Sequence, residues 1–93
     1  RPPPPALPST RTTMHDPVDL TRALVRLDSR NPALVPGAPG ERDAAAHLAD
    51  VLDAWGFAVE VQEAAPGRPN VLARVGRGEE RARTLMLNGH LDV

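Results

Sequence analysis

The 93-residue sequence has no cysteine, no lysine and no tyrosine, and only one tryptophan and one phenylalanine. Without cysteine, a disulfide framework and a thiolate zinc site are both excluded, so His, Asp and Glu would have to hold any metal ion. The net charge is −1, and the eleven basic residues, all arginine, are scattered. Nucleic-acid binding needs a clustered positive surface. We therefore expect no nucleic-acid partner. We also predict no membrane partner and a cytoplasmic location.

Residues 1–13 form a polar, proline-rich leader of a composition typical of disordered sequence. The run Pro2–Pro5 contains a PxxP pattern, which SH3-type domains can bind in the polyproline conformation. No apolar stretch of seven or more residues follows Arg1, so the leader does not resemble a secretory signal. A plainer interpretation is that Met14 is the native start. We predict a non-native leader at 1–13 and a folded segment at 14–93.

Two amphipathic helices are predicted in the first half of the folded segment. The first begins at Asp16, a good capping residue, and ends near Ser29. The second covers about residues 41–54, and Gly56 is suited to end it. Helical spacing of apolar residues supports both helices. The residues that carry this spacing are Leu20, Ala23, Leu24 and Leu27 in the first helix and Ala45, Leu48, Leu52 and Trp55 in the second.

Three acidic or imidazole side chains of the second helix have a spacing that a metal site could use. Asp43 and His47 are four residues apart, and His47 and Asp50 are three apart. All of them lie on the polar face of an amphipathic helix, however. We interpret them as a solvated charge cluster.

Three strands are predicted after the helices. Residues 57–62 alternate between apolar and polar side chains, which is typical of a strand with one buried face. Residues 64–69 are expected to form a loop, and residues 70–75 a second strand. The apolar run within 83–88 predicts a third strand that is buried on both faces and forms a hairpin with the second.

A histidine and a carboxylate follow the third predicted strand. After Gly89, His90 and Asp92 are two positions apart, so extended backbone projects both to the same side, at the strand end where α/β sheets bind ligands. A neutral imidazole binds zinc through one nitrogen while a carboxylate orients the other. We predict His90 as a metal ligand and Asp92 as its orienting carboxylate. The His-x-Asp triplet alone is weak evidence, because a chain with three histidines and seven aspartates often contains it by chance.

The stretch from Leu85 to Val93 resembles the first metal-binding motif of the zinc-dependent aminoacylase, acetylornithine deacetylase, succinyl-diaminopimelate desuccinylase and carboxypeptidase G family. In that family an apolar strand is followed by Gly-His-x-Asp-Val or Gly-His-x-Asp-Thr. The resemblance covers nearly everything from Met14 onward. Further stretches fit the family in order and spacing: Ser29–Pro32, Gly40–Glu41, Trp55–Phe57 and Gly67–Val71.

This resemblance implies a fold class and an activity. The fold would be α/β, the N-terminal part of a three-layer α/β/α zinc-peptidase catalytic domain that is truncated after a central strand. The activity would be hydrolysis of an N-acyl-amino acid or peptide amide bond by metal-activated water. The full-length protein would hold two Zn²⁺ ions, with Co²⁺ or Mn²⁺ as alternatives, and form a homodimer.

The carry-over of family roles is limited to His90 as a zinc ligand and Asp92 as the catalytic carboxylate that supports it. The family's other ligands and its general base lie downstream of this motif, so the fragment itself is expected to be inactive. Glu79 and Glu80 precede His90, whereas the family's paired glutamates follow it.

The alternative hypothesis is a small, self-contained α/β binding or interaction domain without catalysis. Such a domain would end just after a central strand, with no following helix to cover the sheet. This consideration favours the enzyme-fragment hypothesis.

Overall fold

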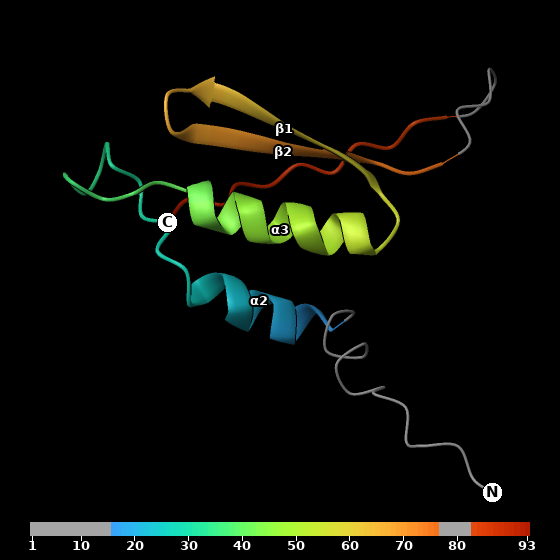
Figure 1. The fold of residues 1–93 in the computed structure, drawn as a ribbon, viewed down its shortest axis with the longest axis horizontal. Coiled ribbons are helices and arrows are strands. Elements are labelled where there is room, and N and C mark those ends of the chain that lie inside the picture. The colour runs from blue at the N-terminus through green and yellow to red at the C-terminus, as the bar shows by residue number, and fades with distance from the viewer. Residues whose placement is uncertain (1–15, 77–82) are drawn as a thin grey trace, which may run out of the picture.

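A computed structural model describes residues 16–76 and 83–93 of the chain (Figure 1). The predictions for the leader 1–13, including its PxxP pattern, and for Glu79 and Glu80 lie outside the described residues. The elements follow one another in the order α2 (Pro17–Val25), α3 (Arg42–Ala54), β1 (Ala58–Ala65) and β2 (Arg68–Arg74).

Helix α2 begins as the sequence predicts. Asp16 is the N-cap in extended conformation, and its Oδ1 accepts a hydrogen bond from the backbone N–H of Val18 at 2.8 Å. Pro17 follows in the first turn, where a missing N–H costs nothing because that group has no partner inside the helix. The helix ends at Val25, so the predicted end near Ser29 is about one turn too late.

Helix α3 agrees with its predicted bounds to within one residue at the start. Gly56 has φ +94°, a left-handed conformation that glycine adopts without strain, and it ends the helix as predicted. The buried residues of α3 are Ala44, Ala45 and Val51, while Trp55 is only half-buried. The predicted core position of Trp55 is therefore only partly realised. Within the described part of the chain, no helix is long and apolar enough to cross a membrane.

Strands β1 and β2 form an antiparallel hairpin around a turn at Pro66 and Gly67. Ala58 pairs with Arg74 at the open end, and Ala65 pairs with Arg68 beside the turn. The predicted loop at 64–69 is thus wrong in its length, because both strands extend into it. The turn closes tightly since the Gly67 N–H donates to Glu63 Oε1 at 2.8 Å.

Helix α3 packs against both strands of the hairpin, and α2 contacts α3 (Figure 1). Within residues 16–76 and 83–93, the buried apolar residues are few and small: Ala38, Ala44, Ala45 and Val51. The two helices and one two-stranded sheet in the described part of the chain are compatible with a small α/β unit. The described residues do not show three layers.

Residues 83–93 correct the most prominent strand prediction. They contain no strand, and the hairpin partner of β2 is β1, not residues 83–88. Leu85, Met86 and Leu87 are exposed by 83%, 78% and 88%. A strand exists only where a neighbour exchanges backbone hydrogen bonds with it, and no described element supplies that neighbour. In Figure 1 the segment passes along α3, and the C-terminus lies near the start of that helix.

Candidate functional site

The loop between α2 and α3 is built on Asn31. Its Oδ1 accepts a hydrogen bond from the Ala33 N–H at 2.8 Å, which is a local turn typical of asparagine. Its backbone carbonyl accepts from the N–H groups of Leu34 and Val35 at 3.0 and 2.8 Å. These bonds leave the side-chain amide of Asn31 free to donate elsewhere.

The C-terminal segment is attached to this loop by two backbone hydrogen bonds. The Asn31 N–H donates to the Val93 carbonyl at 2.8 Å, and the Val93 N–H donates to the Ser29 carbonyl at 3.0 Å. Ser29 is buried. The paired bonds therefore fix the position of Val93 relative to the loop, although 62 positions separate it from Asn31 in the sequence.

Asp92 is held by the same loop. The Asn31 Nδ2 donates to Asp92 Oδ2 at 2.9 Å, and the Asp92 side chain is 28% exposed. This hydrogen bond is the largest cause that lowers the pKa of Asp92 below its usual range, and attraction to His90 and Arg68 acts in the same direction. The carboxylate is thus stabilised in its charged form.

His90 lies beside Asp92, as their spacing predicts. The imidazole Nδ1 is 3.0 Å from the backbone carbonyl oxygen of Asp92 and 3.4 Å from its Oδ1. The His90 side chain is 84% exposed. Because Nδ1 faces two oxygen acceptors, the other ring nitrogen, Nε2, is the one left for a ligand.

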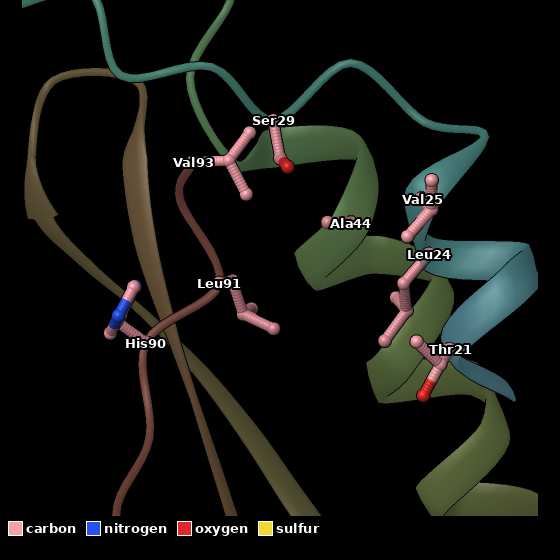
Figure 2. Close-up of a pocket in the computed structure, with 8 residues that line it drawn as sticks. All are labelled: Thr21, Leu24, Val25, Ser29, Ala44, His90, Leu91 and Val93. Atoms are coloured by element: carbon pink, nitrogen blue, oxygen red, sulfur yellow. The ribbon is translucent and has the colours of Figure 1, made fainter. Parts of the chain in front are cut away.

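A shallow hollow of about 150 Å³ lies between α2, α3 and the C-terminal segment (Figure 2). Figure 2 shows Leu91 directed toward Leu24 in this hollow, whereas the His90 imidazole points away from it. Successive side chains of an extended segment point to opposite sides. His90 also lines the hollow, but its imidazole lies on the opposite face of the segment.

A charged pair not predicted from the sequence lies near enough to Asp92 for Arg68 to attract its carboxylate. Arg68 Nε donates to Glu41 Oε1 at 2.7 Å, and Arg68 Nη2 donates to Glu41 Oε2 at 3.1 Å. Only 10% of the Glu41 side chain is exposed, and its hydrogen bonds raise the pKa of Arg68. The sequence marked Glu41 only as a helix start, yet it makes no capping hydrogen bond because its carboxylate is occupied by Arg68.

Two glycines allow this pair to form. Gly40 and Gly67 have φ +78° and +72°, and a Cβ on Gly40 would lie 3.4 Å from Arg68 Cδ and 3.5 Å from the Gly67 carbonyl oxygen. These distances are ordinary van der Waals contacts, so it is the positive φ at both positions that only glycine adopts without strain. The Gly40–Glu41 and Gly67–Arg68 motifs, which were noted separately in the sequence, come together here.

The arrangement brings forward one candidate metal ligand, His90. Among residues 16–76 and 83–93, no group of three or more His, Cys, Asp or Glu side chains is placed to hold a metal ion. The donor chemistry of His90 itself fits zinc, since an exposed imidazole nitrogen opposite a hydrogen-bonded one is the usual ligand. On α3, Asp43 and Asp50 are exposed, in agreement with the interpretation of a solvated charge cluster, while His47 is half-buried.

Comparison with known proteins finds similarity to acetylornithine deacetylases. Proteins of that name from the Classical Ogawa and El Tor Inaba strains of Vibrio cholerae serotype O1 are each 40% identical to this chain over 54 residues. The match covers 58% of this chain but only 14% of each relative. No family model matches the chain, and no solved structure matches it. The similarity is thus partial, and it agrees with the resemblance noted in the sequence.

Proposed function

We propose that this chain is part of a metal-dependent amidohydrolase that cleaves an N-acyl-amino acid or peptide amide bond. The observation that carries this proposal is the His90–Asp92 pair, which lies in a chain with partial similarity to acetylornithine deacetylases. Because the chain spans 14% of the length of those relatives, the substrate and the activity of the whole protein are part of the proposal.

His90 would bind the metal ion through Nε2, and Asp92 would orient the imidazole from the opposite side. When bound, zinc supplies Lewis acidity and lowers the pKa of its water ligand. Asp92 stays charged because Asn31 donates to it, so it favours a proton on Nδ1 of His90. Further ligands, a general base, a second zinc ion and a homodimeric assembly are expected in the whole protein.

The experiment is zinc titration by calorimetry on two proteins: the 93-residue chain and the product of the complete reading frame that encodes it. The variant His90→Ala is made in both proteins. His47→Ala serves as the matched control, because His47 lies on α3 and is distant in the sequence from the His90–Asp92 motif. We expect tight binding in the reading-frame product, loss of that binding in His90→Ala and no change in His47→Ala.

Asp92→Ala should weaken zinc binding by about 10- to 100-fold, the usual effect of removing a carboxylate that orients a metal-bound histidine. Hydrolysis of a panel of N-acyl-amino acids, including N-acetylornithine, should then fall in parallel. Zinc affinity that is unchanged in His90→Ala, or no zinc binding by either protein, would contradict the proposal. That result would favour the alternative of a small α/β interaction domain.

A further inference from the structure

We infer that Asn31 is a positioning residue: it holds Asp92 and the peptide that follows so that the neutral imidazole of His90 carries its proton on Nδ1. The consequence for a metal ion, a free Nε2, rests on the proposed function. The state of the imidazole itself does not, because it follows from hydrogen bonds within this chain.

The first step is the carboxylate. Asn31 Nδ2 donates to Asp92 Oδ2 at 2.9 Å, which occupies one oxygen and fixes the rotation of the carboxylate. The other oxygen, Oδ1, then lies 3.4 Å from Nδ1 of His90. Without the amide of Asn31, the side chain of Asp92 would be free to turn toward solvent or toward Arg68.

The second step is the backbone. Nδ1 of His90 lies 3.0 Å from the carbonyl oxygen of Asp92, and this carbonyl shares its peptide plane with the N–H of Val93. That N–H donates to the Ser29 carbonyl at 3.0 Å, while the Asn31 N–H holds the Val93 carbonyl at 2.8 Å. The loop therefore orients the peptide plane that presents the acceptor to His90.

By these two steps, a loop that is distant in the sequence from His90 determines which ring nitrogen of His90 carries the proton. Both acceptors near Nδ1, the Asp92 carbonyl and the Asp92 carboxylate, depend on contacts with residues 29–31. A neutral histidine side chain in water that has no hydrogen-bond partner within the protein carries its proton mainly on Nε2. A side chain that is 84% exposed should behave in that way unless its neighbours dictate otherwise.

The test is two-bond ¹H–¹⁵N NMR of the 93-residue chain, uniformly labelled, at about pH 8, where an ordinary histidine is neutral. The two ring nitrogens of His90 report directly which of them carries the proton. We expect the Nδ1–H form to predominate at His90. A predominant Nε2–H form in the unmodified chain would overturn the inference without any variant.

Asn31→Asp separates the contact with Asp92 from the folding of the loop. Aspartate keeps the Oδ1 acceptor for the Ala33 N–H but removes the amide donor and places like charges together. We expect His90 to shift toward the Nε2–H form while the Ala33 amide resonance stays in place. Asn70→Ala removes an exposed amide on β2 and should leave His90 unchanged.

An unchanged Nδ1–H form at His90 in both Asn31→Asp and Asn31→Ala would overturn the inference. Zinc titration of the complete reading-frame product, with and without Asn31→Asp, distinguishes the inference from the proposed function. If the ring nitrogens of His90 respond to Asn31→Asp as expected but the reading-frame product binds no zinc, the positioning role of Asn31 stands and the metal role of His90 fails. If the reading-frame product binds zinc through His90 but the tautomer of His90 is the same with and without Asn31→Asp, the metal role stands and the positioning role fails.

Discussion

Replacing Ala45 by leucine tests the packing on which the site depends. Ala45 is 1% exposed, and α3 contacts β1, β2 and α2. Leucine adds three carbon atoms where almost no surface is accessible, and such overpacking costs about 1–3 kcal/mol. The helix propensities of alanine and leucine differ by only about 0.2 kcal/mol, so propensity does not account for a loss of this size.

The assay is urea unfolding followed by circular dichroism. With a urea dependence of about 1 to 1.5 kcal/mol per molar for a chain of this length, we expect the midpoint to fall by about 0.7–3 M. Ala46→Leu is the matched control, because Ala46 is the next residue of the same helix and is exposed. Its stability should change by less than about 0.5 kcal/mol. Equal effects of the two substitutions would refute the packing of α3 described above.

Three further predictions concern helix ends and acid stability. Asp16→Ala should cost about 1 kcal/mol because it removes the cap of α2, and an unchanged urea midpoint would contradict that cap. Gly56→Ala should cost about 1–2 kcal/mol, as φ is +94° and no atom crowds the new Cβ. Gly89→Ala is the control, because Gly89 has an ordinary φ and equal space for a Cβ, and it should leave the stability unchanged. Equal losses of stability in the two variants would refute backbone strain as the cause at Gly56. Since the pKa of Asp92 is lowered mainly by Asn31, its contribution to stability is present above about pH 4 and is lost as the pH falls through the lowered value. Urea midpoints measured between about pH 5 and pH 2 should therefore fall less in Asn31→Ala than in the unmodified chain, and equal falls would contradict this cause.

The helices could be predicted because their signals are local. Asp16 caps its own helix two residues away, and Gly56 ends α3 by its own backbone conformation, so neither depends on distant contacts. Strand pairing is different. Whether 70–75 pairs with the strand before it or after it depends on contacts that periodicity does not encode, and the wrong neighbour was predicted.

In the candidate site, too, the local contacts could be predicted from the sequence and the long-range contacts could not. That His90 and Asp92 point to the same side follows from the period of extended backbone, and the structure places them together. The contact between Asn31 and Asp92 spans 61 positions, and the Glu41–Arg68 pair spans 27. The only sequence signal for either was the family resemblance of the short stretches that contain them, which marks positions without giving their partners.

Burial of the exposed apolar segment and completion of the proposed metal site would both need a further strand beside residues 83–88. The proposed catalytic zinc site would take about three protein ligands, for which the described residues offer His90 as one candidate, and Leu85–Leu87 need a neighbouring strand to be buried. Side chains at the carboxyl ends of adjacent parallel strands meet at one edge of a sheet, so a strand that pairs with 83–88 would bring its own end beside His90. We therefore expect tight zinc binding and slow amide exchange at 85–87 to occur in the same protein. Hydrogen exchange on the zinc-binding product of the reading frame measures this, and fast exchange at 85–87 in a protein that binds zinc tightly through His90 would contradict it.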